Sequence, residues 1–201
     1  MREMTTLCLL ARKYETDKGG RHENYNGNYT SICHEYTPVY WDLLHERRDE
    51  KLNVLEIGIN AGCSLRMWEA FLPKAMIYAV DIDQNYVDNV NAWGDPHIRA
   101  TRADQNSEIS LLTALYRFVP SSYDLIVDDG SHEPAHQITS LVHLLPFLAP
   151  DGLYVIEDIH PGQHFAIAER VPHDFRPSLI RCEPGRGTGD EWLMVIERQP
   201  A

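Results

Sequence analysis

Short apolar runs alternate along the chain with longer amphipathic stretches. The runs are rich in Val, Ile, Leu and Tyr and predict seven strands, at Asn53–Ile57, Met76–Val80, His97–Thr101, Tyr123–Val127, Gly152–Ile156, Ser178–Cys182 and Trp192–Glu197. Apolar residues at helical spacing lie between the first five runs, near residues 64–72, 84–92, 107–118 and 133–148. Strands that alternate with helices predict parallel βαβ units, and therefore a Rossmann-like, doubly wound α/β sheet.

The two ends of the chain depart from this alternation. Residues 183–191 join the last two strands and leave no room for a crossover helix, so these strands should form an antiparallel hairpin at the sheet edge. Residues 1–50 have a helical start, a polar, turn-rich middle at Glu23–Ser31 and a second amphipathic helix near Pro38–Arg48. We expect one domain over residues 1–201, with residues 1–50 as a helical cap and residues 51–201 as the Rossmann-like core.

Composition and charge exclude several classes of protein. Apolar residues make up 43% of the 201 residues and charged residues 24%, values typical of a globular domain and not of a disordered chain. The net charge of −12 argues against nucleic acid as a partner, because phosphates are bound mainly by clustered Lys and Arg.

The sequence also bears on compartment. The apolar stretch at residues 7–11 is followed at once by charged residues, which fits neither a signal peptide nor a membrane span. The cysteines (Cys8, Cys33, Cys63 and Cys182) are far apart and lack the spacing of a zinc site. We expect a cytoplasmic protein with reduced thiols and no membrane contact.

The first predicted strand ends in a glycine-containing turn. Gly58 and Gly62 would let the backbone approach a ligand, and Ser64 is a candidate cap for the following helix. The free N–H groups of that helix would suit a carboxylate, such as an amino-acid tail. A purely structural βα turn is the alternative for this pattern alone.

Acids follow the second and third strands. Asp81 can accept hydrogen bonds from both ribose hydroxyls of an adenosyl ligand, and Asp83 should cap the next helix. A solvated or capping carboxylate is the alternative for Asp81. Asp104 and Gln105 offer adenine contacts. A nicotinamide oxidoreductase is disfavoured because the sequence lacks the Gly-x-Gly-x-x-Gly phosphate turn.

Four acids lie at the ends of the fourth and fifth strands: Asp128, Asp129, Glu157 and Asp158. Neighbouring strands are about 4.8 Å apart, so Asp129, Glu157 and Asp158 can converge at the carboxyl edge. They would repel one another unless a hard cation such as Mg²⁺ bound there, and these three are the predicted metal ligands. The alternative is that the acids cap the helices that follow.

His132 is the candidate catalytic residue. It follows Asp129 by three positions, and its ordinary pKa of about 6.5 suits a general base. Most histidines on loops are merely solvated, and of the several histidines in the second half of the chain we rank only His132 as catalytic.

These stretches resemble the macrocin and mycinamicin sugar O-methyltransferase family, which is related to proteins labelled cephalosporin hydroxylase. The marks are Tyr14-x-Thr16-Asp17-Lys18, His34-x-Tyr36-Thr37-x-x-Tyr40, Leu55-Glu56-Ile57-Gly58, Asp128–His132 and Ile156-Glu157-Asp158. The resemblance implies a class I methyltransferase with Mg²⁺ on Asp129, Glu157 and Asp158 and a base at His132. It also implies S-adenosylmethionine contacts around Glu56, Gly58, Asp81 and Asp104-Gln105, and we place Asp128 with these residues. Two departures from the family pattern are expected: an insertion at Glu23–Cys33, and the lack of the extra N-terminal domain that some members carry.

The resulting hypothesis is a Mg²⁺-assisted O-methyltransferase of natural-product, antibiotic-like biosynthesis that acts on a small hydroxylated acceptor. A deoxysugar hydroxyl is the acceptor that the resemblance favours, and a catechol or another vicinal diol would suit the same metal. The alternative is an S-adenosylmethionine-binding protein of this fold that is a non-methylating partner subunit or catalyses another reaction.

Two further expectations concern the surface. Residues 160–177 should form a lid, with Tyr36, Tyr40, Phe165 and Phe175 either as apolar walls of the acceptor site or as ordinary packing. Apolar residues of the N-terminal helices, namely Leu7, Leu9, Leu10 and Trp41, suggest homo-oligomerisation, and the alternative is that they cover the sheet.

Overall fold

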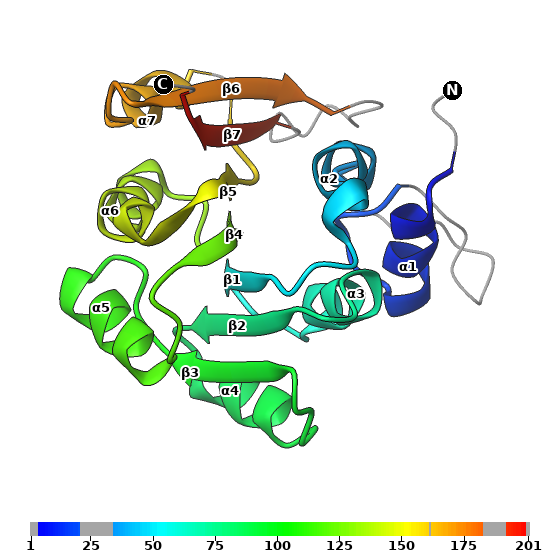
Figure 1. Cartoon of the computed structure of the whole chain (residues 1–201). Coiled ribbons are helices and arrows are strands. Elements are labelled where there is room, and N and C mark those ends of the chain that lie inside the picture. Colours follow the sequence, from blue (N-terminus) through cyan, green and yellow to red (C-terminus); the bar gives the residue numbers. More distant parts are fainter. Residues whose placement is uncertain (1–3, 21–33, 161, 183–191, 200–201) are drawn as a thin grey trace.

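A single seven-stranded sheet in the order β3-β2-β1-β4-β5-β7-β6 forms the centre of the molecule (Figure 1). The computed structural model describes residues 4–20, 34–160, 162–182 and 192–199. The strands are β1 Asn53–Ile57, β2 Met76–Asp81, β3 Ile98–Arg102, β4 Tyr123–Asp128, β5 Leu148–Ile156, β6 Phe175–Arg181 and β7 Trp192–Arg198. The helices are α1 Thr6–Tyr14, α2 Thr37–Leu44, α3 Cys63–Phe71, α4 Gln84–Asn91, α5 Glu108–Arg117, α6 Pro134–Leu144 and α7 His164–Ala168, with 3₁₀ turns at His45–Arg47 and Leu145–Phe147.

Strands β1 to β5 are parallel, whereas β7 runs antiparallel to both β5 and β6. This arrangement confirms the predicted fold: a mostly parallel, Rossmann-like sheet with an antiparallel C-terminal pair. The loop at residues 183–191 and the insertion at Glu23–Cys33 lie outside the described residues. Strand order reverses at β1 and β4, and at such a switch point parallel sheets leave a crevice for ligands beyond their carboxyl ends.

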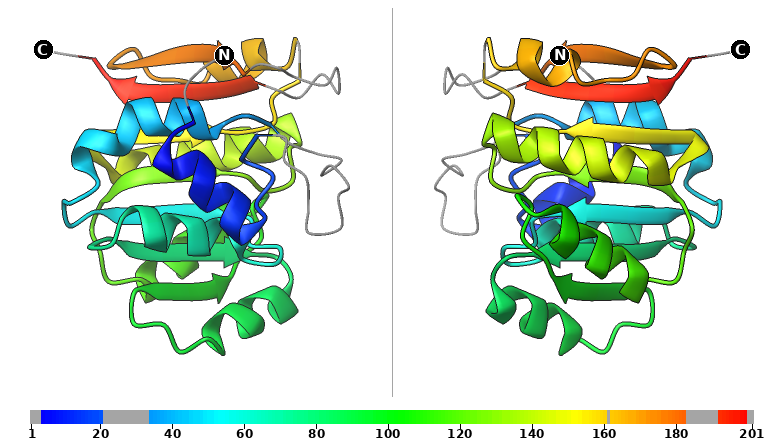
Figure 2. Two further views of the ribbon diagram at one scale, coloured as in Figure 1. Left: turned by 90° about the vertical axis from the view of Figure 1, so that its right-hand side faces the viewer. Right: turned by 90° about the vertical axis from the view of Figure 1, so that its left-hand side faces the viewer.

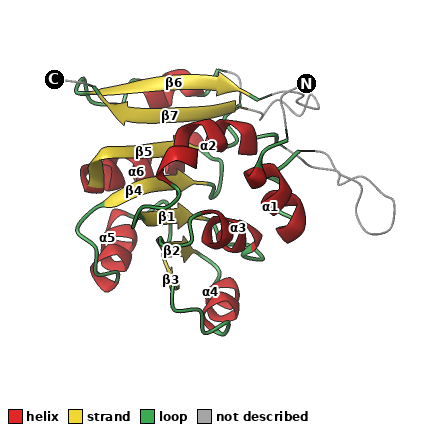
Figure 3. Ribbon diagram, turned by 45° about the vertical axis from the view of Figure 1, so that its right-hand side comes forward, coloured by secondary structure: helices red, strands yellow, loops and turns green. Residues whose placement is uncertain are grey.

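Helices cover both faces of the sheet (Figure 2). An apolar cluster that includes Leu65, Trp68 and Phe71 of α3 packs α1 to α4 against one face. A second cluster, with Leu111 of α5 and Leu141 of α6, fills the other face. Helix α1 contacts both α2 and α3, and Tyr40 of α2 packs against Trp68 of α3, so α1 and α2 lie on the same face of the sheet as α3 (Figure 3).

Local sequence signals explain where several helices begin. Thr5, Asp83 and Ser107 precede α1, α4 and α5, and each accepts a hydrogen bond from a backbone N–H of the first turn. The predicted N-cap role of Asp83 is therefore confirmed. Pro38 stands in the first turn of α2, where a missing N–H costs nothing.

The sequence misjudged some boundaries. Strand β5 begins at Leu148 and not at Gly152, because exposed Pro150 and Asp151 interrupt the apolar run where the register with β4 shifts. Strand β6 begins at Phe175 and contains Pro177, which an edge strand tolerates. Helix α7 was not predicted, because five residues are too few to show a helical period.

Burial corrects one expectation about the surface. Leu7 is fully buried in the first cluster, and Leu10 and Trp41 pack against it, so only Leu9 of the four apolar residues named is exposed. Within the described part of the chain, no two cysteines form a disulfide. In those same ranges no helix combines the length and apolar character needed to cross a bilayer.

Candidate functional site

The candidate site lies where β1, β4 and β5 end together. Ile57 pairs with Asp128, and Asp128 pairs with Ile156, so the next residue of each strand leaves the sheet at the same edge. Gly58, Asp129 and Glu157 occupy these positions. The sheet register thus brings together the residues that the sequence placed at three strand ends.

Gly58 allows the first two of these loops to touch. Its φ is +95°, and a Cβ on this residue would lie 2.0 Å from the carbonyl oxygen of Asp129. Gly62 has a φ of +77°, and a Cβ there would lie 2.4 Å from the Trp93 ring. Both positions require glycine, because the backbone φ is positive and because neighbouring atoms occupy the space that a Cβ would need.

The start of α3 differs from the expectation for Ser64. Gly62 is the N-cap residue, α3 begins at Cys63, and no side chain caps the helix. Ser64 lies inside the first turn and is buried, so its predicted capping role is wrong. The N–H groups of the first turn are left without a side-chain acceptor, which suits a carboxylate ligand.

Asp81 ties the glycine turn to β2. Its carboxylate accepts hydrogen bonds from the N–H groups of Ile59 at 2.7 Å and Asn60 at 3.3 Å, and a third from Asp83 at 2.8 Å. Asp81 therefore stands beside the turn in which the sequence places the adenosyl ligand.

Asp128 is the buried support of the β4 loop. Gln105 Nε2 donates to Asp128 Oδ1 at 2.6 Å, and the Ser140 hydroxyl donates to the other carboxylate oxygen. Gln105 Oε1 also accepts from the Ser131 N–H at 2.9 Å. Burial raises the pKa of Asp128 to about 7, in spite of these hydrogen bonds. Asp128 and Gln105 thus hold the loop that carries Asp129 and His132, while neighbouring Asp104 is exposed.

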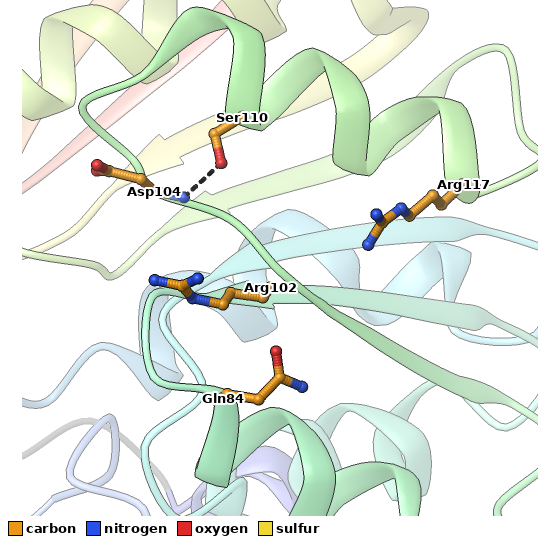
Figure 4. A pocket seen from close by; sticks show the side chains of 5 residues that line it. All are labelled: Gln84, Arg102, Asp104, Ser110 and Arg117. Atoms are coloured by element: carbon orange, nitrogen blue, oxygen red, sulfur yellow. Dashed lines mark hydrogen bonds between the residues drawn. The ribbon is translucent and has the colours of Figure 1, made fainter.

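The cavity nearest to Asp104 has a volume of about 340 Å³ and is lined by Gln84, Arg102, Asp104, Ser110 and Arg117 (Figure 4). The Asp104 N–H donates to Ser110 Oγ at 2.9 Å. This cavity contains none of the acids of β1, β4 and β5. It borders the predicted adenine contact and not the acid cluster.

A buried lysine that the sequence did not single out lies among the acids. The ammonium of Lys18 contacts Asp129 and lies 2.6 Å from Glu157 Oε2 and 3.3 Å from Glu56 Oε1. The residue is only 1% exposed. Burial alone would lower the pKa of Lys18, but Asp129, Glu157 and Glu56 together raise it well above its ordinary value. The only earlier signal was the family mark Tyr14-x-Thr16-Asp17-Lys18.

Glu56 is the most enclosed of these acids. Trp68 Nε1 donates to its Oε2 at 3.0 Å, and its Oε1 has no hydrogen-bond partner beyond the ion pair with Lys18. Burial raises the pKa of Glu56 to about 7, although Lys18 lowers it. Full burial places Glu56 behind the site.

Two tyrosines hold the acids after β5. Tyr36 OH donates to Asp158 Oδ1 at 2.6 Å and accepts from the Asp158 N–H at 3.2 Å. Tyr40 OH donates to Glu157 Oε1. The proposal that Tyr36 and Tyr40 form apolar walls for an acceptor is wrong, because both are fully buried and their hydroxyls bind carboxylates. Phe175 is buried on β6, and Phe165 is 65% exposed.

His132 lies beside Asp158. Its Nδ1 is 3.5 Å from Asp158 Oδ2, and His34 Nδ1 is 3.3 Å from the other oxygen. His132 and Asp158 both have positive φ values, +57° and +55°. Such backbone strain in non-glycine residues is common at functional sites. His132 Nδ1 is buried and makes no hydrogen bond to any described residue, so Asp158 stands beside the imidazole of the candidate base as a charged neighbour.

The side chains fit a divalent cation. Ligand atoms of Asp129, His132 and Asp158 all lie within 4.8 Å of one another. Glu157 lies next to this group but points to Lys18 and Tyr40. Burial, opposed by Lys18 and reinforced by Asp129 and Asp158, raises the pKa of Glu157. Burial and Asp129 raise that of Asp158. Added positive charge would relieve this repulsion.

The alternative reading of the acids as helix caps is excluded. The N-cap residues of α6 and α7 are Glu133 and Gln163. None of Asp128, Asp129, Glu157 and Asp158 occupies either position.

Comparison with known proteins gives a consistent result. Residues 55–159 match a family described as a methyltransferase domain. The chain is 40% identical over 161 residues to mycinamicin VI 2''-O-methyltransferase of Micromonospora griseorubida, which covers 76% of this chain and 36% of that protein. It is 38% identical, with the same two coverages, to demethylmacrocin O-methyltransferase of Streptomyces fradiae.

A solved structure has the same fold. MycE methyltransferase of the mycinamycin biosynthetic pathway, in complex with Mg and SAH, superposes with a TM-score of 0.69 at 28% identity. That superposition covers 96% of this chain and 53% of the other. The chain thus spans little more than a third of the two curated relatives and about half of the solved one.

Proposed function

The chain belongs to the methyltransferase-domain family, and from this premise we propose that it is an S-adenosylmethionine-dependent, Mg²⁺-assisted O-methyltransferase. Its acceptor in this proposal is a hydroxyl of a small natural product, on a sugar or a vicinal diol. The names of the relatives support this choice, since mycinamicin VI 2''-O-methyltransferase and L-olivosyl-oleandolide 3-O-methyltransferase are among them. One MycE structure contains Mg, SAH and mycinamycin VI.

One observation carries the proposal. A histidine and two aspartates with ligand atoms within 4.8 Å of one another stand at the carboxyl edge of the sheet, directly beside the glycine turn of β1. The turn and Asp81 suit an adenosyl amino acid, while Asp129, His132 and Asp158 suit a cation and a base. The contact between Gly58 and Asp129 supports this assignment, because it brings the turn proposed for the cosubstrate beside the loop proposed for the cation.

The residues near the turn would hold the cosubstrate. The uncapped first turn of α3 presents N–H groups to its carboxylate. Asp81 would exchange some of its backbone contacts for the ribose hydroxyls, and Asp104 would face the adenine. Gln105 and Asp128, which are buried, would keep the β4 loop in place.

The acids and His132 would act on the acceptor. S-adenosylmethionine supplies the methyl group when bound, and Mg²⁺ supplies positive charge that makes a nearby hydroxyl more acidic. Asp129, Glu157 and Asp158 are the proposed metal ligands. His132 would take the hydroxyl proton, and the Asp158 carboxylate, 3.5 Å from its Nδ1, would stabilise the charged imidazolium that results. These residues would hold the acceptor oxygen beside the glycine turn and so next to the methyl group, and this positioning of the two reactants would supply much of the acceleration.

The experiment is a methylation assay with labelled S-adenosylmethionine. The acceptors are a deoxysugar glycoside, a catechol and a simple acyclic vicinal diol, each tested with Mg²⁺ and with EDTA. We expect label on the glycoside in Mg²⁺ and none in EDTA. Binding of S-adenosylmethionine without any methylated acceptor would instead favour a binding protein or another reaction on the same scaffold.

A further inference from the structure

Lys18 occupies the place of a cation in the acid cluster. Its ammonium contacts two proposed metal ligands, Asp129 and Glu157, and the buried Glu56 behind them. These three acids come from loops or strands more than thirty positions away from it in the sequence. One positive charge is thus shared by three carboxylates that would otherwise repel one another.

The backbone of the N-terminal segment fixes this lysine. The carbonyl oxygen of Lys18 accepts from the N–H groups of Tyr36 and Thr37 at 2.9 and 3.1 Å. The Asp17 carbonyl accepts from the His34 N–H at 2.9 Å. The same turn therefore anchors Lys18 and the start of α2, from which Tyr36 and Tyr40 reach Asp158 and Glu157. Lys18 is built into the site and is not a surface side chain folded inward.

Charge balance shows what this lysine can do. Glu56, Asp129, Glu157 and Asp158 can carry four negative charges, whereas Lys18 supplies one positive charge to the first three and, among the described residues, only His34 and His132 can supply one to Asp158. The site therefore keeps a deficit of positive charge that a dication can fill. Asp129 belongs both to the lysine cluster and to the group formed with His132 and Asp158. A cation bound by Asp129 and Glu157 must share those carboxylates with the ammonium, and two like charges so close repel.

We propose that Lys18 is the resident counter-ion of the site, which holds Asp129 and Glu157 together when no metal is bound and is displaced from them when a divalent cation binds. The lysine is a positioning residue and not a catalytic one. This inference depends on the metal site of the proposed function, but it concerns cation affinity and not methyl transfer. It predicts that the lysine stabilises the metal-free protein and weakens Mg²⁺ binding.

The first test compares Lys18→Met with wild type by calorimetric titration of Mg²⁺ and by thermal unfolding in EDTA. We expect Mg²⁺ to bind the variant about ten-fold more tightly, because a nearby like charge is removed. In EDTA the variant should unfold at a lower temperature than wild type. Added Mg²⁺ should raise the unfolding temperature of the variant by more than it raises that of wild type. Lys13→Met, which removes an exposed lysine of α1, is the charge-matched control and should leave both quantities unchanged.

Lys18→Arg keeps the charge and should keep Mg²⁺ affinity closer to that of wild type. Equal or weaker Mg²⁺ binding by Lys18→Met would overturn the inference and leave the proposed function standing. Absence of Mg²⁺ binding to wild type and variant alike would overturn both.

A second test uses wild type, in case Lys18→Met does not fold. Amine acetylation followed by peptide mass spectrometry reports the reactivity of each lysine. In EDTA, Lys18 should be protected while the exposed Lys13, Lys51 and Lys74 react. Added Mg²⁺ should raise the reactivity of Lys18 alone. Unchanged protection in saturating Mg²⁺, or full reactivity in EDTA, would contradict displacement.

Discussion

Gly58 and Asp129 touch through their backbones: a Cβ on Gly58 would lie 2.0 Å from the Asp129 carbonyl oxygen. This contact joins the turn proposed for S-adenosylmethionine to the loop proposed for the metal. Because β1 and β4 are neighbours in register, any side chain at position 58 would push these loops apart.

Gly58→Ala should therefore reduce both the stability of the domain and the affinity for S-adenosylmethionine. Adverse φ costs about 1–3 kcal/mol, and the clash with Asp129 adds to this. Gly162→Ala is the matched control, because Gly162 has a similar φ of +91° and no atom within 4 Å of the added Cβ. Urea unfolding measures both variants, and equal losses would show that the contact with Asp129 is unimportant.

Tyr36→Phe should destabilise the fold by about 1–3 kcal/mol, because it leaves the buried Asp158 carboxylate without its hydroxyl donor. Tyr123→Phe is the control: the Tyr123 hydroxyl is buried without a hydrogen-bond partner, so its removal should cost little. The free energy of unfolding in EDTA separates the two. A comparable loss in Tyr123→Phe would mean that the ring environment, and not the bond to Asp158, explains the effect.

Glu56→Gln should change how stability depends on pH. Burial raises the pKa of Glu56 from 4.5 to about 7. Between these values the folded protein keeps a proton that the unfolded chain has released, so the free energy of unfolding falls as pH rises. Glutamine cannot ionise, and the variant should lose part of this decline.

Thermal unfolding of wild type and Glu56→Gln across this pH window checks the prediction, with the exposed Glu46→Gln as control. As pH rises from 4.5 to 7, the unfolding temperature of Glu56→Gln should increase relative to that of wild type. Parallel curves for the two proteins would refute the pKa assignment to Glu56.

His132→Ala should lower the rate of methyl transfer by about 10²–10⁴-fold, the usual contribution of a general base. Affinity for S-adenosylmethionine should change little, because His132 lies beside Asp158 and not on the glycine turn. His143→Ala is the control, since His143 lies on α6 next to Glu108. A variant at position 132 with wild-type turnover would remove this residue from the mechanism.

The sequence predicted the parts of the site that depend on strand ends. Apolar runs located β1, β2, β4 and β5, and parallel topology then brought Gly58, Asp129 and Glu157 to one edge. The capping role of Ser64 was misjudged because α3 begins right after Gly62, which is its N-cap. The sequence pattern does not show whether a helix begins at this point or two residues later.

The residues behind the acids could not be derived from pattern. Lys18 contacts carboxylates up to 139 positions away, and neither periodicity nor local charge indicates such a pairing. From the sequence, Tyr36 and Tyr40 were expected to contribute their apolar rings, either to the wall of an acceptor site or to ordinary packing. Only the tertiary position of α2 shows that their hydroxyls hold Asp158 and Glu157.

The central claim is tested most directly by calorimetric titration of S-adenosylmethionine into the purified chain, with and without Mg²⁺ and against NAD⁺. We predict that wild type binds S-adenosylmethionine and not NAD⁺, and that Asp81→Ala binds it more weakly while Asp88→Ala, an exposed change on α4, does not. Asp129→Ala should still bind S-adenosylmethionine but should lose its response to Mg²⁺. If wild type does not bind S-adenosylmethionine, the proposed function is wrong.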